Sequence, residues 1–249
     1  MVGEHTDSRI YTTTDGGDSW QRTFTNRDPD AFYDCMAFWR GDRHGLAMSD
    51  PVNGRFRFIA TEDGGQTWRR LPRAGMPPAV DGEFGFAASG TCLATAGTRQ
   101  AWMGSGGEAA RIFHTRDRGL TWQVRRAPIP ATPAGGVFSL AFEGLDHGVA
   151  VGGDFERPRN GRDASGFTRD GHSWTGGGDL SGYRSGVAWV PRTVRSVLVA
   201  VGPTGSDVTY DGGRSWTRFS RLNLDAVSCA PDGGCWGSGP EGMVARLVR

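Results

Sequence analysis

The chain has 249 residues, 37% of them hydrophobic and 40 of them glycine, so it can bury a core but is too rich in glycine for a helical bundle. Its 28 basic residues nearly balance 27 acidic ones, which argues against nucleic acid or an anionic membrane as partner. All the basic residues are arginine, and this excludes a Schiff-base lysine, a phosphate-loop lysine and a Ser-Lys dyad.

The apolar residues are scattered rather than gathered into one long run. No stretch approaches about 18 apolar residues, and polar residues follow Met1, so we expect neither a transmembrane segment nor a signal peptide within this chain. The five histidines lack paired metal-ligand spacing, so we expect no metal site, and no motif indicates a cofactor.

The four cysteines form no CxxC pair, which argues against a zinc ribbon or a thioredoxin-like redox site. Disulfides and inert thiols both remain open. Cys229 and Cys235 flank Ala-Pro-Asp-Gly-Gly, a turn sequence that would place them on adjacent strands. Cys35 with Cys92 is the other candidate pair.

One pattern recurs five times, at 13–20, 61–68, 115–122, 168–174 and 209–216, with the fourth copy one residue short. Each copy has a threonine, an aspartate two residues later, glycine, and a Ser/Thr-Trp pair. Such an aspartate can accept backbone N–H bonds in a tight turn, glycine supplies positive φ, and tryptophan can fill the wedge between sheets. The tryptophans lie 48, 54, 52 and 42 residues apart, the period of a four-stranded propeller blade.

In chain order, the repeats predict an all-β propeller of about six four-stranded blades, with incomplete terminal blades and no competing amphipathic helix. A partial blade at 1–24 precedes blades at 31–71, 84–126, 137–176 and 185–219, and a partial blade follows at 226–249. Expected first strands are 35–39, 91–95, 138–142, 186–189 and 226–229, and expected second strands are 45–49, 101–104, 148–152, 197–201 and 235–237. Third strands lead into the repeats, as at 56–60 and 111–114.

The two ends of the chain leave their blades unfinished. Residues 1–3 align with the tail of a second strand, and 243–247 align with a third strand. We therefore expect upstream sequence to be missing from this chain, and whether the native protein has six or seven blades stays open.

The repeat resembles the Asp-box, or bacterial neuraminidase (BNR), repeat. As a single-domain array it is most similar to the photosystem II assembly and stability factor family and its bacterial relatives. That resemblance implies an exported protein, periplasmic or extracellular, that acts as a binding scaffold. The same repeat also occurs in sialidases, xyloglucan-cleaving glycosidases and sorting receptors, so it indicates a fold and not one function.

The repeat aspartates and tryptophans are predicted to be structural. With one aspartate on each blade, they lie too far apart for a catalytic carboxylate pair, whose members are about 5 to 10 Å apart. The residues concerned are Asp15, Asp63, Asp117, Asp170 and Asp211, and Trp20, Trp68, Trp122, Trp174 and Trp216.

The polar residues on the opposite face are the candidates for function. We expect them to converge on one rim and bind a protein or glycan partner, although each could also merely cap its own turn. The predicted binding rim consists of His5, Asp7, Arg9, Asp50, Asn53, Arg55, Asp154, Glu156, Arg157, Arg184 and Asp207.

The alternative function is a glycoside hydrolase of the sialidase-like type. Asp34 and Asp154 would then form an acid–base pair, with Tyr183 beside the attacked carbon. The Phe/Tyr-Arg-Ile-Pro motif typical of sialidases is absent from the sequence. A non-catalytic scaffold is therefore the preferred interpretation.

Overall fold

The computed structural model describes residues 5–193 and 196–248, and this part of the chain is all-β. Its only helical turns are two short 3-10 segments, His5–Asp7 and Pro240–Gly242. Among the described residues, no helix has the length and apolarity needed to span a membrane.

The strands form six antiparallel sheets in chain order. The first sheet is β1 (Arg9–Thr12) and β2 (Gln21–Thr25), and the second is β3 (Tyr33–Phe38), β4 (Gly45–Pro51), β5 (Phe56–Thr61) and β6 (Arg69–Arg70). The third is β8 (Leu93–Ala96), β9 (Gln100–Gly104), β11 (Arg111–Thr115) and β12 (Gln123–Arg126). The fourth is β13 (Gly135–Glu143), β14 (His147–Asp154), β15 (Ser165–Thr168) and β16 (Thr175–Gly176), and the fifth is β17 (Gly186–Trp189), β18 (Leu198–Gly202), β19 (Gly205–Thr209) and β20 (Thr217–Ser220). The last is β21 (Ala226–Cys229), β22 (Cys235–Ser238) and β23 (Val244–Arg246).

Two short strands were not predicted from the sequence. β7 (Glu83–Phe84) and β10 (Gly106–Gly107) continue the fourth sheet beyond β13, although both precede that sheet in the chain. Their pairing places the segments around residues 84 and 106 beside the beginning of β13.

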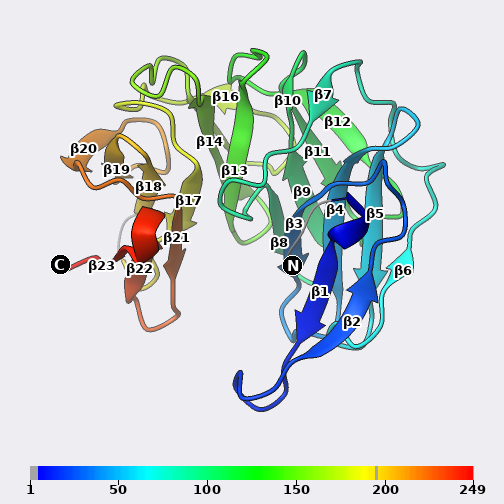
Figure 1. Cartoon of the computed structure of the whole chain (residues 1–249). Helices are drawn as coiled ribbons and strands as arrows, with labels where there is room; N and C mark the ends of the chain where they lie inside the picture. The colour runs from blue at the N-terminus through cyan, green and yellow to red at the C-terminus, as the bar shows by residue number, and fades with distance from the viewer. Residues whose placement is uncertain (1–4, 194–195, 249) are drawn as a thin grey trace.

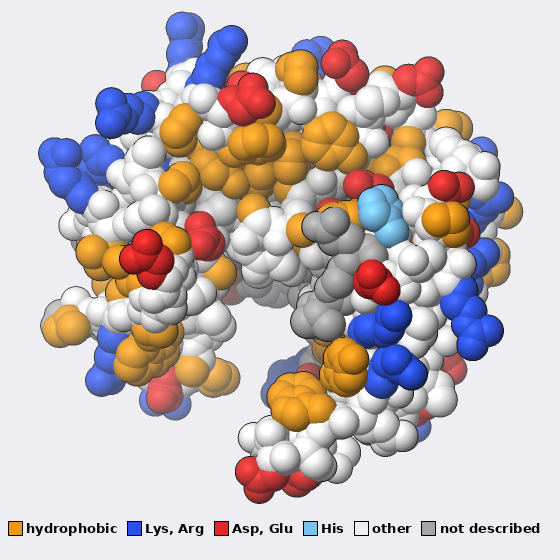
Figure 2. Space-filling view, viewed as in Figure 1, with side chains coloured by type: hydrophobic (Ala, Val, Ile, Leu, Met, Phe, Trp, Pro, Cys, Tyr) orange, Lys and Arg blue, Asp and Glu red, His pale blue; other side chains and the backbone are white. Residues whose placement is uncertain are grey.

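The sheets follow one another around an arc, and the first and last sheets face each other across a gap (Figures 1 and 2). The described residues therefore form a β-propeller with four complete blades, and its first and last sheets have two and three strands, as expected from the repeats. The predicted second-strand tail at residues 1–3 lies outside the described residues.

Apolar clusters hold neighbouring sheets together. Between the second and third sheets, Phe56 meets Phe113 edge-on with ring centroids 5.3 Å apart, and Trp122 stacks on Phe58 at 4.7 Å. Similar clusters fill the next two interfaces, around Trp102 and around Leu198. Each interface buries large apolar side chains. Full burial of one Leu, Ile or Phe side chain stabilises the folded state by about 1.5–3 kcal/mol.

The repeat aspartates bind the backbone of their own turns. In the second copy, the Thr61 hydroxyl donates to Asp63 Oδ1 at 2.8 Å, and the Thr67 N–H and hydroxyl donate to the two carboxylate oxygens at 2.9 and 2.5 Å. Hydrogen bonds from Thr67 and Thr61 lower the pKa of Asp63 to about 2. The shorter fourth copy keeps the same role, because the N–H groups of His172 and Ser173 both donate to Asp170.

The tryptophan of the first copy departs from the prediction that every repeat tryptophan fills a wedge. Trp122 is buried, and Trp68, Trp174 and Trp216 are half-buried against the sheet that precedes them. Trp20 is 61% exposed, because the described chain has no sheet before the first one. Its indole N–H donates only within its own turn, to the carbonyl of Gly17.

All four cysteines are paired in the structure. Cys35 on β3 is bonded to Cys92, just before β8, and so links the second and third sheets with a Cα–Cα distance of 5.9 Å. Cys229 and Cys235 face each other in the register of β21 and β22 and close that hairpin.

Candidate functional site at the propeller mouth

The repeat turns and the candidate binding loops occupy opposite ends of the blades. In a four-stranded antiparallel blade, the turn between the second and third strands lies at the same end as the connection to the next blade. We call this end the mouth, and it is formed by segments 49–55, 72–86, 127–136, 154–164, 177–185 and 202–205. Backbone hydrogen bonds join these segments, for example from Phe155 N–H to the Ala134 carbonyl and from Tyr183 N–H to the Pro158 carbonyl.

An aromatic cluster lies at the mouth. Phe86 stacks on Phe138 with centroids 3.6 Å apart, and Phe138 meets Tyr183 edge-on at 4.6 Å. Phe84 packs against Phe86 at 5.1 Å, and Phe155 approaches both Phe86 and Phe138 at 6.4 and 6.3 Å. Phe86, Phe138 and Tyr183 are buried, whereas Phe155 is 49% exposed. The cluster therefore joins the connection between the second and third sheets to the fourth sheet and to the connection that follows it, and Phe155 presents an apolar surface to solvent.

Two carboxyl groups lie beside this cluster, on the second sheet. Asp34 on β3 is only 6% exposed and its Oδ2 has no hydrogen-bond partner among the described residues. Asp50 on β4 accepts the Gly85 N–H at 2.7 Å. A Cβ at Gly85 would lie 2.6 Å from Met48 Cε and 3.1 Å from Asp34 Oδ2, so the chain passes close to the pair at this glycine.

Burial and mutual repulsion disfavour ionisation of this pair. Burial raises the pKa of Asp34, and the Asp50 charge raises it further. Burial also raises the pKa of Asp50, against the opposing effect of its hydrogen bond from Gly85. The two groups titrate together, so the pair retains a proton well above the pKa of an ordinary aspartate. The proximity of Asp34 and Asp50 was not predicted. The alternation of side chains along β3 and β4 does not show that both carboxyl groups lie next to Gly85.

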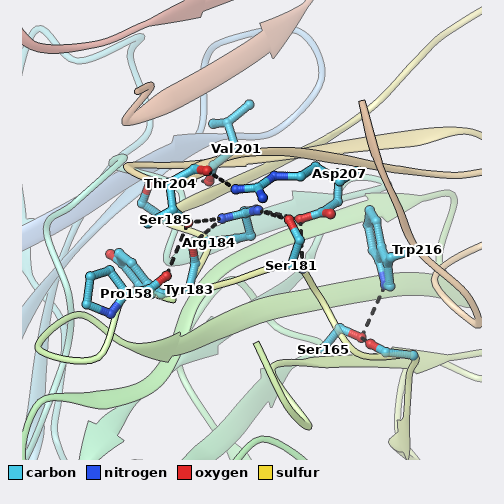
Figure 3. Close-up of polar contacts among 12 residues, drawn as sticks. Pro158, Ser165, Ser181, Tyr183, Arg184, Ser185, Val201, Thr204, Asp207 and Trp216 are labelled. Atoms are coloured by element: carbon cyan, nitrogen blue, oxygen red, sulfur yellow. Dashed lines mark hydrogen bonds and ion pairs between the residues drawn. The ribbon is translucent and has the colours of Figure 1, made fainter. Parts of the chain in front are cut away.

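Two predicted rim residues are buried and do not belong to an accessible binding surface. Arg184 and Asp207 are 0% and 1% exposed, and Arg184 Nε lies 2.6 Å from Asp207 Oδ2 (Figure 3). The guanidinium also donates to the Tyr183 carbonyl, the Thr204 hydroxyl and the Ser181 hydroxyl. Burial lowers the pKa of Arg184, while the Asp207 charge opposes that effect. The prediction was wrong for this pair because the ion pair fastens the connection before β17 to the β18–β19 hairpin.

The other rim residues divide between exposed side chains and side chains that bond within loops. His5, Asp7, Asn53, Glu156 and Arg157 are exposed, and Arg9, Asp50, Arg55 and Asp154 are half-buried. Arg9 donates to the Thr6 carbonyl at 2.5 Å, and Arg55 donates to the Met76 carbonyl. The Arg9 bond lies within its own turn, which is the capping role that the sequence left open, whereas the Arg55 bond joins two segments of the mouth.

Of the three residues assigned to the hydrolase alternative, two are inaccessible. Asp34 and Tyr183 are buried, and burial raises the pKa of the Tyr183 hydroxyl. Asp154 accepts a hydrogen bond from the Thr132 hydroxyl at 3.0 Å and another from the Glu156 N–H at 2.9 Å. A substrate would reach Asp34 or Tyr183 only after the residues packed around them moved.

A second buried ion pair fixes β7 at the mouth. Glu83 is buried, and its Oε1 accepts from Arg111 Nε at 2.8 Å and from the Ser105 hydroxyl at 2.5 Å. This contact ties β7, which is paired into the fourth sheet, to β11 of the third sheet. The sequence signal that could have located it is the Phe-Gly-Phe segment, 84–86, which follows a proline-containing connection without belonging to a repeat.

Comparison with known proteins gives a result at the level of fold. No protein-family model matches the sequence, and no curated protein matches it. Among solved structures, YCF48 bound to a D1 peptide has a TM-score of 0.52 and 20% identity, with 87% of this chain and 63% of that chain covered. This chain thus spans less than two thirds of that YCF48 chain.

Enzymes share the fold as well. The GH74 enzyme of Niastella koreensis has a TM-score of 0.60 and 16% identity, with 96% of this chain and 34% of that chain covered. An α-L-arabinofuranosidase mutant from Fusarium graminearum, in complex with an iminosugar inhibitor, has a TM-score of 0.56 and 15% identity, with 97% and 84% covered. At these identities the likeness establishes a β-propeller and leaves function to be argued from the mouth.

Proposed function

We propose that the protein is a non-catalytic propeller that binds an extended segment of a protein partner at its mouth. The observation that carries this proposal is the aromatic cluster, in which Phe155 stands 49% exposed beside the buried Phe86 and Phe138. Exposed aromatic side chains on a fixed support are typical anchors of protein interfaces.

The loop that carries Phe155 also carries positive charge. Arg157, Arg159 and Arg162 are exposed on the segment between β14 and β15. Figure 2 shows basic side chains gathered at the upper left, over the loops beyond β14 and β16 in Figure 1. An apolar anchor next to arginines fits a segment that has an apolar side chain near a carboxylate.

The loops of the mouth are held in place by buried ion pairs. Arg184 with Asp207, and Arg111 with Glu83, each tie a connection to a neighbouring strand. A surface that is fixed in advance loses less conformational freedom when a partner binds. The fold neighbour bound to a D1 peptide adds support, since it shows that a propeller of this shape can hold a peptide.

Phage display of random peptides tests this function directly. Selection on the wild-type protein should enrich peptides that combine an aromatic or aliphatic residue with Asp or Glu, and their binding should weaken as ionic strength rises. Phe155→Ala should weaken binding about tenfold or more, and Arg157→Ala by a smaller step. Leu145→Ala, at a 42% exposed apolar residue in the β13–β14 turn at the opposite end, is the matched control and should bind normally.

The hydrolase alternative is tested with a panel of fluorogenic glycosides. If the protein is a non-catalytic scaffold, it should hydrolyse none of these glycosides. Turnover that survives purification and disappears in Asp34→Asn or Asp154→Asn would reject the scaffold and identify those carboxyl groups as catalysts. Selected peptides whose binding is unchanged by Phe155→Ala would reject the mouth as the binding surface.

We also propose that the protein works in an oxidising compartment, which agrees with the export that the family resemblance implies. Both cysteine pairs are disulfide-bonded in the structure, and disulfides persist outside the reducing cytosol. Thiol titration of the denatured native protein should therefore find no free cysteine. Four titratable thiols would contradict this proposal.

A further inference from the structure

One contact recurs between successive repeats. In the first four repeats, the residue three positions before the repeat threonine packs with or hydrogen-bonds the tryptophan of the next repeat. Phe58, three residues before Thr61, stacks on Trp122. Ile10 and Ile112 occupy the same position and share apolar clusters with Trp68 and Trp174. The third strand of each sheet thus supplies a contact residue for the tryptophan that opens the fourth strand of the following sheet.

In the fourth sheet this contact residue is a serine. Ser165 lies three residues before Thr168, and the indole N–H of Trp216 donates to its hydroxyl oxygen at 3.2 Å (Figure 3). The Ser165 hydroxyl in turn donates to the Gly178 carbonyl at 2.6 Å. Serine at this position therefore accepts a hydrogen bond from the next tryptophan.

The fifth sheet has the same serine but no tryptophan to meet it. Ser206, three residues before Thr209, is 1% exposed, and its hydroxyl has no hydrogen-bond partner among the described residues. It lines a mostly apolar cavity of about 290 Å³ between the fifth and last sheets. A second cavity of about 330 Å³ adjoins it, because Val199, Phe219, Leu247 and Val248 line both.

In the described part of the chain, no fourth strand of the last sheet covers these cavities. Within residues 196–248, β23 is paired with β22 alone, whereas the four complete sheets have a fourth strand that follows their repeat tryptophan. Apolar side chains around the cavities are exposed, among them Phe219, Leu222 and Val248. An unpaired strand edge beside an apolar groove is suited to the addition of a further strand.

We propose that this groove binds an extended, tryptophan-bearing segment of another polypeptide. The segment adds as an antiparallel strand to the free edge of β23. Its indole enters the cavity between the fifth and last sheets and donates its N–H to the Ser206 hydroxyl, as Trp216 does to Ser165. This site lies at the last sheet and is separate from the aromatic cluster of the mouth.

A second copy of the chain is a poorer occupant, although Trp20 is exposed. Trp20 opens β2, which is already paired with β1. β1 occupies the third-strand position of its sheet, as β23 does in the last sheet. The edge of β2 that would have to pair with β23 is already paired with β1, so β2 cannot pair with both strands. A free extended segment has no such conflict.

The chain itself provides a probe for the experiment. A synthetic peptide of residues 209–220 carries a repeat turn, Trp216 and the fourth strand that follows it. Binding of the fluorescein-labelled peptide to the intact protein is measured by anisotropy. Saturable binding is expected, with a loss of about tenfold or more when the peptide carries Trp216→Ala. Replacing that tryptophan by naphthylalanine, which has no N–H, should weaken binding about two- to tenfold.

Protein variants locate the binding site. Ser206→Ala should weaken peptide binding about two- to tenfold without lowering the melting temperature, because it removes a buried hydroxyl that is unpartnered in the free protein. Val248→Glu places a charge on an exposed residue of both cavities and should abolish binding. Val80→Glu, at an exposed valine outside the last two sheets, is the matched control. Phe155→Ala should leave this binding unchanged, which separates this site from the mouth.

Three results would overturn the proposal. The first is the absence of peptide binding up to a peptide concentration of about 1 mM, where a binding free energy of about −4 kcal/mol would give half-saturation. The second is binding that does not depend on the tryptophan or on Val248. The third is concentration-dependent self-association that Val248→Glu and Trp20→Ala both abolish, which would make a second copy the occupant.

Discussion

Replacement of Asp34 by asparagine should remove a pH dependence from the stability of the protein. In the folded state the pKa values of Asp34 and Asp50 lie above that of an ordinary aspartate, about 4. The folded protein therefore keeps a proton that the unfolded chain has released, so the free energy of unfolding falls as the pH rises above about 4. One proton of difference corresponds to about 1.4 kcal/mol per pH unit, or about 2.7 kcal/mol between pH 5 and pH 7.

Urea denaturation at several pH values between about 5 and 7 measures this effect. Asparagine at position 34 keeps the shape of the side chain and cannot ionise. The free energy of unfolding of Asp34→Asn should therefore fall less steeply with pH than that of the wild type, by up to about 1.4 kcal/mol per pH unit. Glu156→Gln, at an exposed residue of the mouth, controls for a change of one unit in net charge. Parallel pH profiles for Asp34→Asn and the wild type would show that the pair does not hold the extra proton.

Three further changes test the fold and the mouth. Arg184→Leu leaves Asp207 buried without its partner and should cost about 3–5 kcal/mol in urea denaturation, whereas Arg69→Leu, which breaks an exposed pair with Glu62, should cost less than about 1 kcal/mol. Phe86→Ala should cost about 3–5 kcal/mol because Phe86 is stacked and buried, and that loss is likewise read from the urea midpoint. Hydrogen bonds hold the pKa of Asp63 at about 2, so its contribution to stability is present above about pH 4 and is lost as the pH falls toward 2. Acid titration of the melting temperature should therefore show a smaller decrease in Asp63→Ala, which is less stable at neutral pH.

The repeats predicted the sheets because their physics is local. An aspartate, a threonine and one or two glycines within eight residues determine a turn, and the turn determines which strands pair. The predicted strand at 186–189 coincides with β17, and that at 226–229 coincides with β21. Both are short apolar strands that follow a connection between blades, and the period of the repeat determines where in the sequence they can begin.

The mouth could not be predicted in the same way, because its contacts join residues that are far apart in the chain. Phe86 and Phe138 stack although 51 other residues separate them in the sequence. Arg184 is an arginine in a glycine- and serine-rich connection, and composition there favours an exposed side chain. Its burial depends on Asp207, on a different strand, which neutralises its charge.

The same reasoning explains why repetition reveals more than any one copy of the repeat. Ser206 is an ordinary strand serine when considered alone, and its missing hydrogen bond would suggest only a small local defect. Ser165, at the equivalent position, shows which group donates a hydrogen bond to such a serine: the indole N–H of the next tryptophan. The unpartnered hydroxyl, the adjoining apolar cavities and the free edge of β23 then have one common explanation, the position of a strand that this part of the chain does not supply.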